Sequence, residues 1–228
     1  MNQRMHLQEE CPVGNQECPV FKEVQRLKEK CRKLEKLSQI DTLTRFFNFR
    51  YLMLSLKREM ERTRRTGFPT GLIMIDLDHF KKINDTHGHD AGNKALIWIA
   101  EIWLKNIRCI DIPCRYGGDE FVIILPGTDL PQVILTAKRL RLVLEKSQIK
   151  LNNKTIELTA SFGANTYRGE SDLSVDAFIE RTDKFLLKAK SKGRNHVCYD
   201  ESEKVMKPTE VTVEEREKLF IGNRQPPL

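Results

Sequence analysis

Long apolar stretches are missing from this sequence of 228 residues. Apolar runs such as Leu72–Ile75 and Phe121–Leu125 are only four or five residues long, whereas a membrane-spanning helix needs about 20. The first residues, MNQRMHLQEECPVG, lack the apolar core of a secretory signal peptide. We therefore expect a cytoplasmic protein without a membrane span, in which the six cysteines are mostly thiols.

A strong excess of one charge is also missing. The chain has 39 Lys and Arg against 32 Asp and Glu, which gives a net charge of +7. This mild excess suits an anionic ligand such as a nucleotide. The sequence has no platform of interleaved aromatic and basic residues, so we expect no nucleic-acid partner. The hydrophobic share of 39% is enough for one sizeable core.

The N-terminal part divides into two segments. Residues 1–19 look irregular, and Cys-Pro-Val occurs at residues 11–13 and again at residues 18–20. Residues 20–40 have the a/d spacing that is typical of a helix in a short parallel coiled coil, and hence of a homodimer. Two heptads are marginal on their own, so a single helix docked on its own domain is the alternative. The predicted seam consists of Val20, Val24, Leu27, Cys31 and Leu34.

Hydrophobic periodicity and turn signals predict an ordered series of elements after the seam. Helices are expected over residues 48–65, 91–107, 131–146 and 175–190. Strands are expected over 70–77, 112–116, 120–125, 156–165 and 196–199, with a hairpin turn at Gly117-Gly118. The order βαββαβ predicts an α+β fold with a ferredoxin-like or palm-type antiparallel sheet flanked by helices. Residues 201–228 are polar and read as a tail.

Three polar clusters stand at the ends of the predicted core strands. They are Asp76-Leu77-Asp78, Asp119-Glu120, and a basic run from Lys188 to Arg194. Each alone has an ordinary explanation, as a cap, a solvated hairpin tip or a complement to a helix dipole. Together they offer oxygen ligands for Mg²⁺ or Mn²⁺ and positive charge for phosphates. This combination indicates phosphoryl or nucleotidyl transfer.

The motifs resemble a known family. Gly117–Phe121 reads GGDEF, the signature of the GGDEF family of bacterial diguanylate cyclases. Asp41–Thr44 resembles the DxLT opening of that family, and Asp76–Asp85 resembles its DxDxFKxxND segment. Gly88-His89-Asp90 with Gly92 resembles GHxxG, and the segment from Thr182 to Asn195 resembles the closing AD…AK…GRN. The resemblance covers residues 41–200, which we take as the catalytic domain.

The resemblance implies a reaction and a set of residue roles. Two chains, each with one GTP, would condense the two molecules into cyclic di-GMP and release two pyrophosphates. Catalytic roles would fall to Asp119, Lys81 and Glu120. Mg²⁺ or Mn²⁺ would be bound by Asp76, Leu77, Asp119 and Glu120. The substrate would contact His79, Phe80, Asn84, His89, Asn93, Gly117, Gly118, Lys190 and Arg194.

One position departs from the family pattern. The family usually has Asp where this chain has Asn93, and that carboxylate would accept hydrogen bonds from the guanine edge. An amide offers one acceptor oxygen and an NH₂ group, which can face adenine N1. A relaxed enzyme that also makes cyclic GMP-AMP is therefore an alternative to a strict diguanylate cyclase.

A second ligand site is implied upstream of the signature motif. Arg108-Cys109-Ile110-Asp111 resembles the RxxD motif of allosteric product inhibition by cyclic di-GMP. Arg139 matches a further arginine of that site, and Arg62 matches a contributor from a neighbouring subunit. A catalytically weak module that only binds cyclic di-GMP is a further alternative. In a different class, Cys11, Cys18 and Cys31 suggest a redox or metal sensor.

Overall fold

The computed structural model describes residues 19–37, 39–151, 154–170 and 173–201. The chain forms two compact units, Met1–Ile40 and Asp41–Leu228. Within the part of the chain that the structure describes, no helix is long and apolar enough to cross a membrane. The expected irregular segment and the expected tail lie almost wholly outside the described residues.

The described part of the first unit is helix α1 (Pro19–Leu37). Three residues of the predicted seam are exposed on it, Val20 by 71%, Val24 by 40% and Leu27 by 47%. The side chains of Cys31 and Leu34 lie outside the described residues. The helix is thus present, and its pairing with a second copy stays a prediction.

The second unit holds a five-stranded sheet with the order β2-β3-β1-β6-β7. Among the strands of this sheet in the described residues, β6 and β7 pair in parallel and the other neighbours pair antiparallel. Four of the strands, in the order β2-β3-β1-β6, form the predicted ferredoxin-like arrangement, which confirms the α+β fold class. The strands are β1 (Thr70–Leu77), β2 (Ile112–Gly117), β3 (Glu120–Leu125), β6 (Ala160–Tyr167) and β7 (Val197–Cys198).

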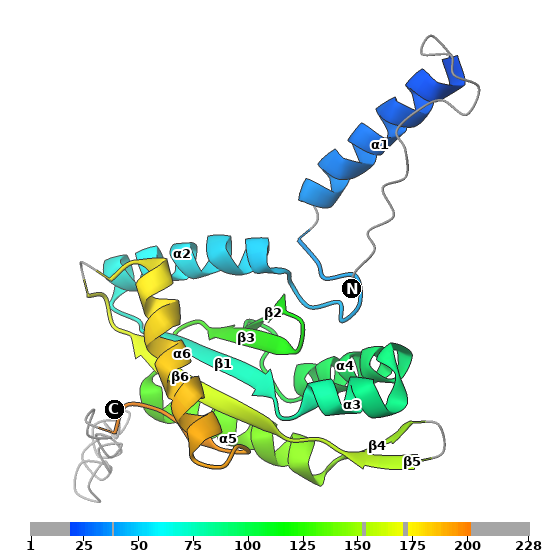
Figure 1. Cartoon of the computed structure of the whole chain (residues 1–228). Helices are drawn as coiled ribbons and strands as arrows, with labels where there is room; N and C mark the ends of the chain where they lie inside the picture. The colour runs from blue at the N-terminus through cyan, green and yellow to red at the C-terminus, as the bar shows by residue number, and fades with distance from the viewer. Residues whose placement is uncertain (1–18, 38, 152–153, 171–172, 202–228) are drawn as a thin grey trace, which may run out of the picture. The chain divides into compact units, whose positions relative to one another are not determined.

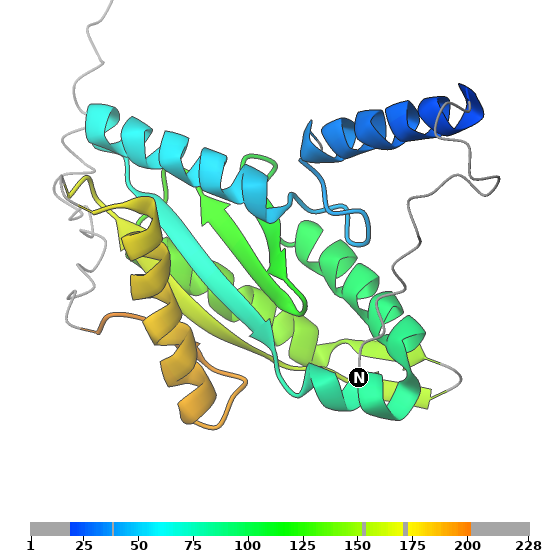
Figure 2. The same ribbon diagram turned by 45° about the horizontal axis from the view of Figure 1, so that its top comes forward.

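Helices cover both faces of the sheet, as Figures 1 and 2 show. Helices α2 (Phe49–Thr66) and α6 (Val175–Ser191) lie on one face, and α4 (His89–Leu104) and α5 (Leu130–Lys146) lie on the other. Successive side chains of a strand point to opposite faces. Ile73 and Ile75 therefore join the core under α4 and α5, whereas Leu72 and Met74 join the core under α2 and α6. The same alternation turns Asp76 towards the α6 face.

Three predictions of local structure were wrong. Helix α3 (Phe80–His87) was not predicted, because it is short and buries only Phe80. The expected strand 156–165 is two strands, since β5 (Lys154–Glu157) pairs with β4 (Gln148–Leu151) in a separate hairpin before β6 begins. The β2–β3 turn is Gly118-Asp119 rather than Gly117-Gly118, because a register shift between Arg115 and Gly117 moves the turn by one residue.

Candidate active site

Strand pairing brings the predicted metal ligands together. Asp76, near the end of β1, is the register partner of Glu120 at the start of β3. The Leu77 backbone N–H donates to the carbonyl of Asp119 at 3.3 Å, which fixes the turn beside the end of β1. Asp119 itself lies between β2 and β3. Residues 43 positions apart in the sequence thus share one edge of the sheet.

The carboxylates at this edge repel one another. The pKa of Asp76 is raised by burial and also by the charges of Asp119 and Asp78, while Lys190 opposes the shift. The pKa of Glu120 is raised by burial and by Asp76, with smaller contributions from Asp119 and Asp183. Lys190 Nζ stands 2.8 Å from Asp76 Oδ2. Burial and mutual repulsion both favour a bound cation here.

Lys190 is the only positive group that opposes these shifts among the described residues. No group of three or more Asp, Glu, His or Cys side chains among them is already gathered as a metal cage. This holds for the predicted ligands too. The oxygen-only donor set of Asp76, Asp119 and Glu120 nevertheless suits Mg²⁺ or Mn²⁺.

Helix α3 begins immediately after this edge. His79 precedes its first residue with a φ of 56°, in the left-handed region. Phe80 is buried and anchors the helix start, while Lys81 is exposed. The backbone N–H groups at a helix start attract anions. His79, Phe80 and Lys81 are thus placed beside the carboxylates, where the sequence predicts contacts to phosphates.

The end of α6 supplies the other predicted phosphate ligands. Lys190 lies in the last turn of α6, and Arg194 follows three residues after the helix ends. Arg194 and Asn195 both have positive φ, 66° and 48°. The backbone N–H of Arg194 donates to the carbonyl of Ala189 at 3.2 Å. Lys190 contacts Asp76 directly. Arg194 lies in the turn that follows, four residues after Lys190 in the sequence.

The predicted nucleoside contacts lie on α3 and α4. A Cβ on Gly92 would overlap the side-chain oxygen of Asn84, so the glycine lets the two helices approach. Asn84 is half-buried, whereas His89 and Asn93 are exposed. Asn84 and Gly92 are in contact, and His89 and Asn93 lie at the start of the same helix α4.

Two further residues with structural roles at the site were missed by sequence reasoning. Arg115 donates to the carbonyl of Gly118 from Nε at 3.0 Å and from Nη2 at 2.7 Å. Its Nη1 also reaches Asp41 Oδ1 at 3.2 Å, so one guanidinium ties the signature turn to the DxLT motif. Asp78 is buried, and its carboxylate accepts three hydrogen bonds. Its place as the second acid of Asp-Leu-Asp was the signal that could have found it.

The signature glycines are not crowded by the protein. A Cβ on Gly117 would meet Glu120 Oε2 at 4.0 Å, and one on Gly118 would meet no described atom within 4 Å. Gly118 has a φ of 36°, which disfavours a side chain. Space therefore remains beside the turn, as the predicted nucleotide contact requires.

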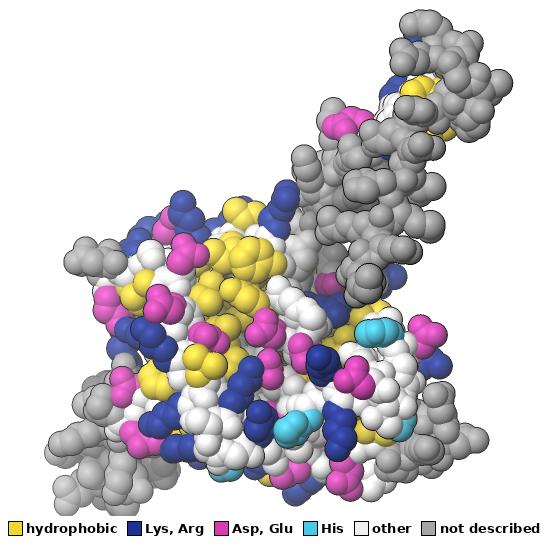
Figure 3. Space-filling model, viewed as in Figure 1, with side chains coloured by type: hydrophobic (Ala, Val, Ile, Leu, Met, Phe, Trp, Pro, Cys, Tyr) yellow, Lys and Arg dark blue, Asp and Glu magenta, His cyan; other side chains and the backbone are white. Residues whose placement is uncertain are grey.

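An apolar hollow adjoins Glu120 on the α2 and α6 face. Figure 3 shows apolar side chains gathered on this face with acidic side chains around them. The cavity of about 430 Å³ is floored by Phe49, Met53, Met74, Tyr116 and Ile179 and rimmed by Glu120, Asp176, Glu180 and Asp183. The negative rim extends the electronegative character of the carboxylate edge. It favours cations over phosphates on this side of Glu120.

Three of the predicted product-inhibition residues lie together. The backbone N–H of Arg108 donates to Asp111 Oδ2 at 2.7 Å. Asp111 is 7% exposed; burial raises its pKa, while the Arg108 hydrogen bond and the charges of Arg108 and Arg139 lower it. Its Oδ1 has no hydrogen-bond partner among the described residues. Arg62 lies on α2 and pairs with Glu59 at 3.2 Å; none of the described contacts joins it to Asp111.

The cysteines that suggest a redox or metal sensor cannot be compared with the structure. Cys11 and Cys18 lie outside the described residues, as does the side chain of Cys31. Of the described cysteines, Cys109 is exposed, and Cys114 and Cys198 are buried free thiols. Burial raises the pKa of Cys114 to about 12, so this thiol is unreactive at neutral pH.

Two curated proteins are similar to this chain in sequence. The chain is 39% identical over 163 residues to the response regulator PleD of Caulobacter vibrioides, which covers 71% of this chain and 36% of PleD. It is 39% identical over 159 residues to the diguanylate cyclase DosC of Escherichia coli, which covers 69% of this chain and 34% of DosC. The chain thus spans about a third of the length of these curated relatives.

Two solved structures of this kind are similar to this chain in fold. Diguanylate cyclase SiaD from Pseudomonas aeruginosa matches with a TM-score of 0.68 and 31% identity over 79% of this chain and 70% of SiaD. The coiled coil and GGDEF domain of DgcB from Caulobacter crescentus, solved in complex with c-di-GMP, matches with a TM-score of 0.68 and 27% identity over 79% of this chain and 95% of that one. The family model described as diguanylate cyclase, GGDEF domain, matches residues 38–196. With the signature turn, the sheet order and this match in agreement, the chain belongs to the GGDEF family.

Proposed function

We propose that this chain is a diguanylate cyclase, which condenses two GTP molecules into cyclic di-GMP and releases two pyrophosphates. One observation carries the proposal: β1 and β3 bring Asp76, Glu120 and Asp119 to one edge of the sheet, where Lys190 lies 2.8 Å from Asp76. Mutually repelling carboxylates with a basic helix end suit a cation and a triphosphate. The catalytic domain of the proposal is residues 41–200.

Asp76, Asp119 and Glu120, with the Leu77 carbonyl, would hold the Mg²⁺ or Mn²⁺. The bound ion would supply positive charge against the triphosphate. In the proposed reaction the 3′-oxygen of one GTP attacks the α-phosphorus of the other. The bond from that phosphorus to the pyrophosphate breaks, and Asp119 takes up the proton of the hydroxyl.

Other residues of the chain bind and orient GTP. Lys81, Lys190 and Arg194 offset the charge of the triphosphate, together with the backbone N–H groups of His79 and Phe80. Gly117 and Gly118 leave space for the nucleotide. Asn84, His89 and Asn93 would contact the nucleoside. Because each chain binds one GTP, the reaction needs two chains facing each other, and the exposed seam of α1 would join them.

The same proposal includes feedback by the product. Asp111 Oδ1 is a buried acceptor without a partner among the described residues, and an unpaired buried acceptor is costly. The N–H groups of a guanine edge would donate to Asp111 Oδ1. The guanidinium groups of Arg108 and Arg139 would donate paired hydrogen bonds to the phosphates. Arg62 would join from a neighbouring subunit. Cyclic di-GMP bound there would hold the two half-sites apart.

Product analysis tests the proposal directly. The purified chain is incubated with GTP, with ATP and with both, in Mg²⁺ and in an excess of chelator, and the products are separated by chromatography. We expect cyclic di-GMP and pyrophosphate from GTP in Mg²⁺ only. A chain that binds cyclic di-GMP but turns over no nucleotide would instead be the binding module.

A further inference from the structure

The buried carboxylate of Asp78 makes contacts that the proposed chemistry does not use. Asp78 is 6% exposed and comes just after β1. Its Oδ1 accepts from Ser161 Oγ at 2.7 Å, and its Oδ2 accepts from Thr159 Oγ1 at 2.8 Å. Oδ2 also accepts from the backbone N–H of Asn195 at 2.9 Å. Asp78 therefore connects the end of β1 to a turn 117 positions further along the chain.

That turn has an unfavourable backbone conformation. Gly193, Arg194 and Asn195 all have positive φ, at 105°, 66° and 48°. Residues with side chains avoid this region unless their surroundings hold them there. A hydrogen bond from a backbone N–H to an ionised carboxylate is about twice as strong as a neutral one. The bond from Asn195 to Asp78 is thus placed to hold the turn in shape.

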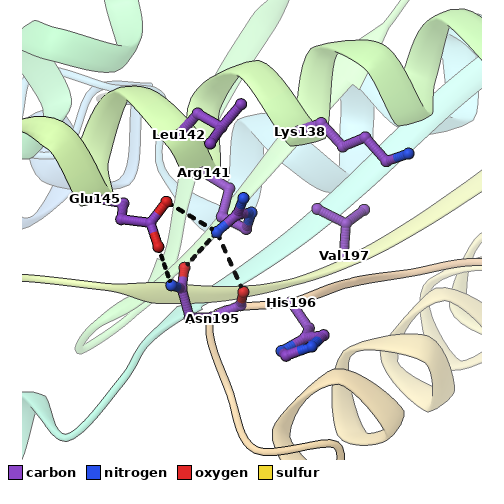
Figure 4. Close-up of a pocket in the computed structure, with 7 residues that line it drawn as sticks. All are labelled: Lys138, Arg141, Leu142, Glu145, Asn195, His196 and Val197. Atoms are coloured by element: carbon purple, nitrogen blue, oxygen red, sulfur yellow. Dashed lines mark hydrogen bonds and ion pairs between the residues drawn. The ribbon is translucent and has the colours of Figure 1, made fainter.

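Helix α5 also contacts this turn, through Arg141 and Glu145, as Figure 4 shows. The side-chain amide of Asn195 donates to Glu145 Oε1 at 2.6 Å. Its side-chain oxygen accepts from Arg141 Nη1 at 3.0 Å, and Arg141 also pairs with Glu145 at 3.2 Å. The contacts on Asn195 from Asp78 and from Glu145 differ in burial, since Asp78 is buried and Glu145 is exposed. The hydrogen bond to Asp78 is therefore better shielded from solvent than the hydrogen bond to Glu145.

We propose that Asp78 is a positioning residue for the triphosphate, because it holds the turn of residues 193–195 and thereby fixes Arg194 near Asp76 and Lys190. The inference rests on the proposed function, which assigns Arg194 to the triphosphate. Asp78 touches neither the substrate nor the metal in this role. It acts through the backbone of Asn195, the residue next to Arg194.

A double-mutant cycle in the full chain tests the inference. The probe is 3′-deoxy-GTP with Mg²⁺, which lacks the attacking hydroxyl and is bound but not cyclised. We expect Arg194→Ala to weaken binding by roughly 10–100-fold and Asp78→Asn by about 10-fold. The double variant should bind within about twofold of Arg194→Ala alone, because residues that act through one another are not additive. Glu157→Gln removes an exposed charge near Thr159 and should bind as the wild type does.

Hydrogen exchange of the peptide covering residues 190–199 gives a readout that is independent of nucleotide. Asp78→Asn should speed exchange in this peptide, and Glu157→Gln should not. Losses of affinity that multiply in the double variant, or unchanged exchange in Asp78→Asn, would overturn the inference. If Arg194→Ala binds the probe normally, the proposed triphosphate contact is at fault, and exchange alone decides whether Asp78 holds the turn. If Asp78→Asn does not fold, Ser161→Ala removes one donor to Asp78 and should show the same pattern at smaller scale.

Discussion

The carboxylate edge of the sheet and the Arg108–Asp111 loop both contain a carboxyl group whose pKa is raised by burial. They differ in what surrounds it. At Asp76 the further contributions that raise the pKa come from other acids, Asp119 and Asp78, against one lysine. At Asp111 every contribution besides burial lowers the pKa, through a backbone N–H and two arginines.

This difference indicates what each site lacks. The edge with Asp76, Asp119 and Glu120 has an excess of negative charge, which a divalent cation would neutralise. The loop already has its positive charge, and one oxygen of Asp111 has no donor among the described residues. It therefore lacks a neutral hydrogen-bond donor, such as a base edge. Substitutions should separate the two sites cleanly.

The largest effect is expected at Asp119. Asp119→Ala removes a proposed metal ligand and proton acceptor, so we expect the rate of cyclic di-GMP formation to fall at least about a thousandfold. Binding of cyclic di-GMP to the Arg108–Asp111 loop should be unchanged, as measured by calorimetry. Circular dichroism checks that the variant is folded. Full activity in a folded Asp119→Ala protein would remove the proposed mechanism.

Removal of the predicted seam should affect the catalytic edge more than the loop. The proposed reaction needs two chains, whereas Arg108, Asp111 and Arg139 would all come from one chain. Deletion of residues 1–38 lowers the effective concentration of facing half-sites. We expect specific activity to drop by roughly 10–100-fold at nanomolar protein and to recover at high concentration. Specific activity that does not change on dilution would show that α1 does not form the active dimer.

Arg108→Ala is the counterpart of the Asp119 variant. It removes the guanidinium but keeps the backbone N–H that bonds Asp111 Oδ2, so the loop should keep its shape. A lost charge-assisted hydrogen bond weakens binding by roughly 10–150-fold, and the inhibition constant for cyclic di-GMP should rise accordingly. The initial rate should stay within about twofold. Lys105→Ala, a nearby loss of one positive charge, is the control; equal inhibition of all three proteins would reject the loop as the inhibitory site.

Much of the sheet could be predicted from the sequence, because β1 and β3 are apolar runs with clear ends. The ferredoxin-like arrangement also predicts that neighbouring strands bring Asp76 and Glu120 together, and the register of β1 and β3 pairs the two residues. Helix α3 could not be predicted, since its one buried residue, Phe80, leaves no periodicity to detect. The break between β5 and β6 could not be predicted either, because buried Leu158 continues the apolar pattern from one strand to the next.

For the candidate site, the sequence indicates which acids lie close together but not which contacts hold them in place. Spacing and resemblance indicate which acids meet at the sheet edge. They do not reveal that Arg115 holds the signature turn through Gly118, or that Asp78 reaches Asn195. These bonds join residues that are far apart in the sequence or need a particular backbone conformation. Only the folded chain shows which donor meets which acceptor.

The two sites also differ in the group they offer to a base. The proposed product site in the loop would offer the carboxylate of Asp111, whereas the proposed nucleoside pocket would offer the amide of Asn93. We expect mainly cyclic di-GMP from equal GTP and ATP, with some mixed cyclic GMP-AMP. Asn93→Asp should raise the preference for GTP by about tenfold, since a charged acceptor strengthens the guanine contact. Identical product ratios for the two proteins would show that position 93 does not set base choice.

The smallest effect is expected on stability, at Asp76. Its folded-state pKa lies above the ordinary value of 3.8, so the folded chain binds this proton more tightly than the unfolded chain does. The free energy of unfolding should therefore fall as pH rises from the ordinary value through the raised one, and stay lower above it. Asp76→Asn removes the charge and should melt about 2–4 °C higher than the wild type at pH 8 without metal, which corresponds to about 1 kcal/mol.

The pH and metal dependence of melting distinguishes this explanation from a general gain in packing. The advantage of Asp76→Asn should vanish near pH 3, where the wild-type carboxyl is itself protonated. Mg²⁺ should stabilise the wild type and not the variant, because binding to the folded state alone raises stability. In Asp111→Asn, where arginines already neutralise the charge, Mg²⁺ should stabilise as it does in the wild type. If Asp76→Asn melts below the wild type at pH 8, the ion pair with Lys190 stabilises the ionised Asp76 by more than burial and repulsion destabilise it. The carboxylate edge would then not require a cation to offset its charge.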